Sequence, residues 1–161
     1  MPARGQIGAN YFDLLKESQV WINLEPQGLE PGPNPIEFNV TLAFPGRSLP
    51  DAPLAVDLRV EAYCLLFPTR IRQAQLALSV YGADLELARS TDPLQLKPAC
   101  GHDIGWLDVI IARVPFATLR RIAAAGRVEM HALGFDVRLS PADLQALQTF
   151  VSAVADGVTL R

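Results

Sequence analysis

Strict alternation of apolar and polar residues is the feature that most constrains this chain. In residues 36–44, IEFNVTLAF, large apolar side chains occupy every even position and Glu, Asn and Thr stand between them. Residues 54–66, LAVDLRVEAYCLL, repeat the pattern. Successive side chains of a strand point to opposite faces of its sheet, so this period predicts strands with one buried and one polar face.

Two further segments are predicted to form hairpins. In residues 73–89, QAQLALSVYGADLELAR, a two-residue loop at Gly82-Ala83 suits a tight turn and sets Val80 opposite Leu85. The apolar positions of the two strands then meet on one face.

Residues 127–139, RVEMHALGFDVRL, form the second predicted hairpin, with Leu133-Gly134 as its loop. This register sets Glu129 opposite Arg138, and it sets His131 opposite Asp136. Opposite charges facing each other across two strands favour that pairing.

Helices are predicted late in the chain. A short helix is expected near 116–125, and a longer one near 141–155 begins with a capping box formed by Ser140 and Asp143. A short helix over residues 11–17 is a further expectation.

These elements predict a mainly β fold in one domain spanning 1–161. We expect an antiparallel β-sandwich or a partly open barrel of about eight or nine strands. The C-terminal helix is expected to cover one sheet face or an open end of the barrel.

Composition and charge limit the function. Half of the 161 residues are apolar and 19% are charged, against about a quarter in a typical domain. The core is therefore well filled, or apolar surface is kept for a partner. A net charge of −3 argues against a nucleic-acid partner.

The sequence has neither a secretory signal nor an apolar run that would span a membrane. We therefore expect a cytoplasmic protein that does not bind membranes. The abundance of Ala, Leu and Arg points to a GC-rich genome, and we expect a bacterial source.

One loop gathers reactive residue types: Cys100, His102 and Asp103 in PACGHDIGW, residues 98–106. A catalytic thiolate needs a base within hydrogen-bond reach, and a zinc site needs four ligands. Proline and glycine bound the segment, so a plain connection between strands is the preferred interpretation. Catalysis by these residues is the alternative, and we expect neither a metal site nor a cofactor.

Asp108 stands out because it interrupts the apolar run WLDVIIARV, residues 106–114, whose composition predicts a central strand. A buried carboxylate there would need a partner or a raised pKa. Trp106 shares its face in the predicted strand, and the two residues are candidate ligand-binding residues beside a pocket.

Motifs for phosphate loops, dinucleotide sites, zinc helices and serine nucleophiles are all absent from the sequence. We therefore expect a non-catalytic interaction domain that binds a protein partner or itself. The first alternative is a β-domain that binds a small molecule or peptide near Trp106 and Asp108. The second is an enzyme that depends on Cys100 and His102.

Overall fold

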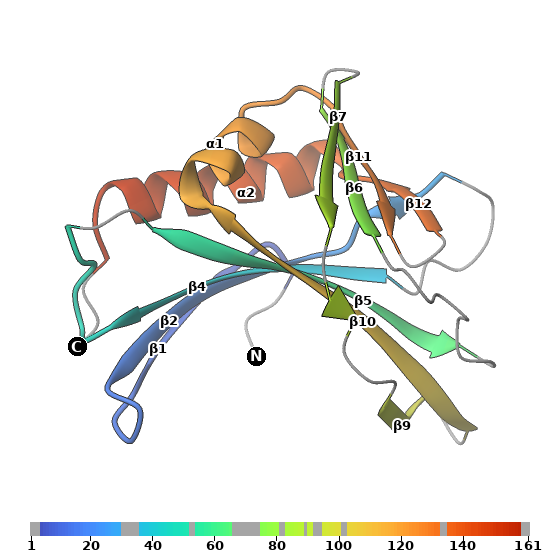
Figure 1. Ribbon diagram of the computed structural model, residues 1–161, viewed down its shortest axis with the longest axis horizontal. Coiled ribbons are helices and arrows are strands. Elements are labelled where there is room, and N and C mark those ends of the chain that lie inside the picture. Colours follow the sequence, from blue (N-terminus) through green and yellow to red (C-terminus); the bar gives the residue numbers. More distant parts are fainter. Residues whose placement is uncertain are drawn as a thin grey trace.

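A computed structural model of the chain describes residues 4–29, 36–51, 54–65, 75–80, 83–88, 90–91, 95–100, 103–132 and 135–158. Of these residues, residue 135 and those that fall between 62 and 108 are described by their backbone alone. The described part holds twelve strands and two helices, which confirms the mainly β fold (Figure 1). The strands are β1 (Ile7–Phe12), β2 (Glu17–Leu24), β3 (Gln27–Gly28), β4 (Ile36–Pro45), β5 (Ala55–Leu65), β6 (Gln75–Val80), β7 (Ala83–Ala88), β8 (Ser90–Thr91), β9 (Gln95–Cys100), β10 (Asp103–Pro115), β11 (Val128–Ala132) and β12 (Phe135–Arg138). The helices are α1 (Phe116–Ala123) and α2 (Pro141–Ala155).

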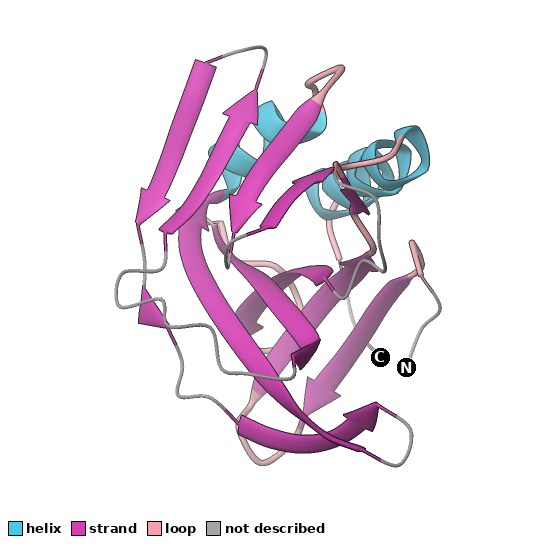
Figure 2. Cartoon of the chain, turned by 90° about the vertical axis from the view of Figure 1, so that its right-hand side faces the viewer, coloured by secondary structure: helices cyan, strands magenta, loops and turns pink. Residues whose placement is uncertain are grey.

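The strands form two antiparallel sheets. The larger has seven strands in the order β1-β2-β4-β5-β10-β8, with β9 also paired to β10. The smaller has five, in the order β3-β12-β11-β6-β7. Neither closes into a barrel among the described strands, and both helices and the smaller sheet lie on one side of the larger sheet (Figures 1 and 2).

The core lies between the larger sheet and the helices. Along β4 the burial alternates strictly, as the sequence pattern predicts, and the even-numbered residues face inward. The helices contribute fully buried apolar side chains to the same core, which are Leu119 and Ile122 from α1 and Leu147 and Phe150 from α2. The odd-numbered residues of β4, among them Glu37, Asn39 and Thr41, lie half-buried on the opposite face.

The β11–β12 hairpin has the register that its charges predict. Glu129 lies opposite Arg138 and His131 opposite Asp136. Arg138 Nη2 donates to Glu129 Oε1 at 2.6 Å, and His131 Nδ1 lies 2.7 Å from Asp136 Oδ1.

The register predicted for the β6–β7 hairpin is wrong by two residues. Val80 pairs with Ala83 and Leu78 with Leu85, so the connection is residues 81–82. A shift of two residues leaves every side chain on the same face. Apolar alternation alone therefore does not distinguish the two registers.

The capping box of α2 forms as predicted, since Asp143 N–H donates to Ser140 Oγ and Ser140 N–H donates to Asp143 Oδ2. Helix α1 ends at Ala123, two residues earlier than expected. The prediction of a helix over residues 11–17 is wrong. Tyr11 and Phe12 end β1, residues 13–16 form a turn, and Glu17 begins β2.

Candidate functional site

The structure places Cys100 and Asp103 as partners across the β9–β10 hairpin, joined by residues 101–102. His102 lies outside the described residues, as do the side chains of the other two. Residues 101–102 alone connect the two paired strands, and the rest of residues 98–106 belongs to β9 and β10. A catalytic role for these three residues stays a prediction.

Strand β10 is central, as predicted, with β5 on one side and β8 and β9 on the other. Trp106 pairs with Leu65, Asp108 pairs with Ala62, and the register shifts between the two pairs. The side chains of Trp106 and Asp108 lie outside the described part of the chain. Their role in ligand binding stays a prediction.

An acid pair lies on the polar face of the larger sheet, where Glu37 of β4 is directly opposite Glu61 of β5. Glu61 is only 7% exposed and forms an ion pair with Arg59. The pKa of Glu37 is raised above its ordinary value, mainly by partial burial and to a smaller extent by the negative charges of Glu61 and Glu25. Among the described residues no group of three His, Cys, Asp or Glu side chains is placed to hold a metal ion.

The turn of the β1–β2 hairpin carries the most exposed leucines of the described chain. Leu14 is 100% exposed and Leu15 is 68% exposed. The turn closes through Leu15 N–H, which donates to the carbonyl of Phe12 at 3.1 Å, and Lys16 adopts a left-handed φ of 52°. The turn lies at the lower left of Figure 1 and points away from the helices. We call residues 13–16 the tip.

Contacts with the end of β4 hold the tip in place. Gly46 N–H donates to the carbonyl of Lys16 at 2.8 Å, and Ser18 Oγ donates to the carbonyl of Gly46 at 2.5 Å. The guanidinium of Arg47 stacks over the ring of Tyr11 at 3.8 Å. These contacts fix the two ends of the turn, and Leu14 and Leu15 are exposed between them.

Strand β1 forms one edge of the larger sheet, since β2 is its one neighbour among the described strands. Natural proteins protect an exposed edge with charges, prolines or bulges. Residues 6–12, QIGANYF, contain neither a charge nor a proline, and Ala9 and Asn10 are exposed. Among the described strands, none pairs with the outer side of β1, residues 7–12.

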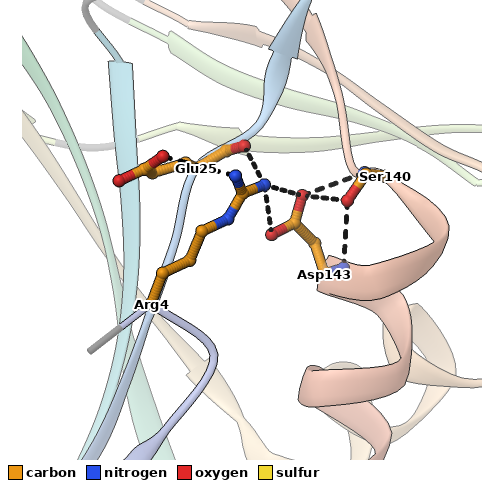
Figure 3. A network of polar contacts seen from close by, with 4 residues as sticks. All are labelled: Arg4, Glu25, Ser140 and Asp143. Carbon is orange, nitrogen blue, oxygen red and sulfur yellow. Dashed lines mark hydrogen bonds and ion pairs between the residues drawn. The ribbon is translucent and has the colours of Figure 1, made fainter. Parts of the chain in front are cut away.

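A polar network lies at the other end of β1 (Figure 3). Arg4 Nη2 donates to the carbonyl of Glu25 at 2.9 Å and to both carboxylate oxygens of Asp143 at 3.1 and 3.2 Å. Asp143 is 2% exposed and also accepts from Ser140 Oγ at 2.7 Å. The network joins the segment before β1 to the first turn of α2.

Beside this network the surface has a hollow of about 360 Å³. Its lining comes from the segment before β1 and from one face of α2, namely Arg4, Gly5, Ala142, Asp143, Gln145, Ala146 and Thr149. The tip and the hollow thus lie at opposite ends of β1.

Neither the tip nor the hollow was predicted from the sequence. A short apolar run fits a helix as well as a strand, and residues 11–17 form the hairpin turn and its flanks instead of the predicted helix. The uncharged run of residues 6–12 is followed by three charged residues within five positions, Asp13, Lys16 and Glu17, and such a polar cluster after an apolar run is compatible with a turn between strands. The hollow joins residues far apart in the sequence and had no local signal.

No helix among the described residues is long and apolar enough to cross a membrane. No family model, curated protein or solved structure matches this chain.

Proposed function

We propose that this chain is a non-catalytic, cytoplasmic interaction domain that binds another protein chain through strand β1 and the tip. The observation that carries the proposal is the pair of exposed leucines, Leu14 and Leu15, on an ordered turn beside an unprotected sheet edge. Large exposed apolar side chains that are held in place are typical of protein contacts. An edge strand adds the backbone hydrogen bonds of strand addition.

Site-specific photo-crosslinking in living cells tests this proposal. A photoreactive residue at position 14 is expected to give one defined adduct in high yield, and the further substitution Leu15→Asp is expected to abolish it. The matched control is position 29, because Leu29 is also an exposed leucine, at 43%, but lies outside β1 and the tip.

Any protein captured at position 14 is then purified and titrated against the wild-type chain and against the Leu15→Asp variant. Saturable binding by the wild type alone supports the proposal. Equal adducts at positions 14 and 29, or none at position 14, would overturn it.

A further inference from the structure

We infer that the outer face of the larger sheet binds a neutral oligosaccharide, with one sugar ring stacked on Trp21 and its hydroxyl groups bonded to the amide side chains around that residue. The outer face is the side of this sheet opposite to the helices and the smaller sheet (Figures 1 and 2). The inference goes beyond the proposed function, which uses the edge of β1 and the tip. Three observations carry it: the position of the indole, the side chains around it, and an unsatisfied acceptor.

The first observation is how the indole of Trp21 lies. A Cβ atom placed on Gly8 would be 2.4 Å from Trp21 Cε2, and 2.6 and 2.7 Å from the two ring atoms bonded to it, Cζ2 and Nε1. Because the middle atom of these three is the nearest, the ring covers Gly8 with its flat face and not with its edge. Trp21 is half-buried, as expected of a ring with one face on the backbone and the other turned outward.

The second observation is the set of side chains around Trp21. Neighbours on the same face of a sheet, across one strand or two residues along a strand, lie within about 8 Å of each other. In the observed registers the polar neighbours of Trp21 are four amides and one hydroxyl, namely Asn10 of β1, Gln19 and Asn23 of β2, and Asn39 and Thr41 of β4. None of them carries a charge. We call Trp21 and these five residues the amide platform.

The asparagines of the amide platform are unusual for strands. Asparagine is depleted in strands, yet three of the four asparagines of the chain lie here. Two of them, Asn23 and Asn39, are direct partners across β2 and β4. Residues that oppose the local preference of the backbone and gather at one place are typical of functional sites.

The third observation is the side chain of Asn39. Its Oδ1 is buried and accepts no hydrogen bond within the part of the chain that the structure describes. A buried acceptor without a donor is unfavourable and rare in folded proteins. Asn39 as a whole is half-buried on the outer face, so rotation of its amide turns this oxygen toward a ligand there. A sugar hydroxyl then supplies the missing donor.

The chemistry of the amide platform selects an uncharged sugar. An amide side chain both donates and accepts hydrogen bonds, as each sugar hydroxyl does. The face of an aromatic ring is negative and attracts the C–H groups of a sugar ring. An acidic ligand would need a free cation, but the arginines of the outer face next to the platform are paired, Arg59 with Glu61 and Arg113 with Asp57.

Tryptophan fluorescence tests the inference, because the chain has two tryptophans and Trp106→Phe leaves Trp21 as the one indole. This variant is titrated with four neutral hexasaccharides: cellohexaose, maltohexaose, mannohexaose and N-acetylated chitohexaose. We expect at least one of them to change the emission of Trp21 saturably, with a dissociation constant on the order of 0.1–1 mM. Hexagalacturonate, an acidic hexasaccharide, is the matched probe and is expected to leave the emission unchanged.

Titration calorimetry of substituted chains tests the residues. Trp21→Leu is expected to abolish binding of the hexasaccharide found by fluorescence. Asn10 is exposed, and Asn10→Ala is expected to raise the dissociation constant about 5-fold through the loss of one hydrogen bond. Gln145→Ala is the matched control, since Gln145 is an exposed amide of α2, on the other side of the sheet, and is expected to leave the dissociation constant unchanged. Circular dichroism establishes that each variant folds.

Saturable binding of a neutral hexasaccharide that Asn10→Ala weakens, that Trp21→Leu abolishes and that Gln145→Ala leaves unchanged supports the inference. If Trp21→Leu does not fold, the comparison of Asn10→Ala with Gln145→Ala decides alone. No binding of any of the four neutral hexasaccharides overturns the inference, and so does binding that a folded Trp21→Leu chain retains. Tighter binding of hexagalacturonate than of the neutral probes overturns it as well.

Discussion

The contact between Arg4 and Asp143 gives a prediction whose size follows from the structure. Asp143 is 2% exposed and accepts four hydrogen bonds, two from Ser140 and two from Arg4. Replacing Asp143 with alanine removes the return half of the capping box and the partner of the guanidinium. We therefore expect this substitution to destabilise the fold more than any other in the network.

The magnitude has two parts. Loss of the return half of the capping box removes the two hydrogen bonds that Ser140 donates to Asp143 and costs about 1 kcal/mol. A hydrogen bond to a charged group contributes about 1.5–3 kcal/mol when buried, but the side chain of Arg4 is 44% exposed, and this screening reduces its share to about 1 kcal/mol. The expected loss for Asp143→Ala is thus about 2 kcal/mol, which lowers the melting temperature by about 4–8 °C in a chain of this size.

A double-mutant cycle isolates the ion pair from the cap. Arg4→Met, Asp143→Asn and the double variant are unfolded in urea, and their free energies of unfolding are compared. We expect a coupling energy of about 1 kcal/mol that falls only partly in 1 M salt, since Asp143 is buried. Ser140→Ala is the matched control for the cap and is expected to leave the coupling between Arg4 and Asp143 intact.

A coupling energy below about 0.3 kcal/mol would refute this reasoning, because it would mean that a pair with a buried carboxylate behaves like a fully exposed one. A coupling that vanishes in salt would refute it as well.

Three more predictions concern the larger sheet. Lys16→Gly should raise the free energy of unfolding by about 0.5–1 kcal/mol, because glycine adopts the left-handed φ of 52° without steric cost, and urea unfolding measures the gain. Glu37→Gln should stabilise the protein at pH 7, because the pKa of Glu37 is raised in the folded protein, beside Glu61, and folding therefore disfavours the charged carboxylate. Melting curves across pH should show that this gain disappears below about pH 4, where Glu37 is protonated in the folded and the unfolded state. Gly8→Ala should destabilise the sheet by about 1–3 kcal/mol in thermal unfolding, because the added Cβ would lie 2.4 Å from the Trp21 ring, and Trp21→Leu should relieve that loss.

Much of the fold follows from local patterns in the sequence. The β11–β12 register was predictable because two opposite-charge pairs fix it, as the contacts of Glu129 with Arg138 and of His131 with Asp136 demonstrate. The capping box at Ser140 was predictable because both of its residues lie within four positions. The β6–β7 register was not, since its outward residues offer no charge pair and a shift of two keeps the faces unchanged.

The candidate surface was harder to predict for a physical reason. Burial of Glu61 depends on what packs across the sheet, and alternation reports only the face on which a side chain lies. Exposure of Leu14 depends on the turn being a hairpin instead of a helix, and a short apolar run fits either. The hollow needs Gly5 and Ala146 to meet across the fold, and no pattern along the chain records that contact.

Amide hydrogen exchange along β1 tests whether β1 and the tip bind a protein chain. Exchange is followed by mass spectrometry at low and high protein concentration, and with any partner captured at position 14. We predict that amides of residues 8–16 become protected on binding, and that those of α1 and of β11 keep their exchange rates. Unchanged exchange over residues 8–16 in a complex that demonstrably forms would contradict the claim, because the contact would then lie elsewhere on the molecule.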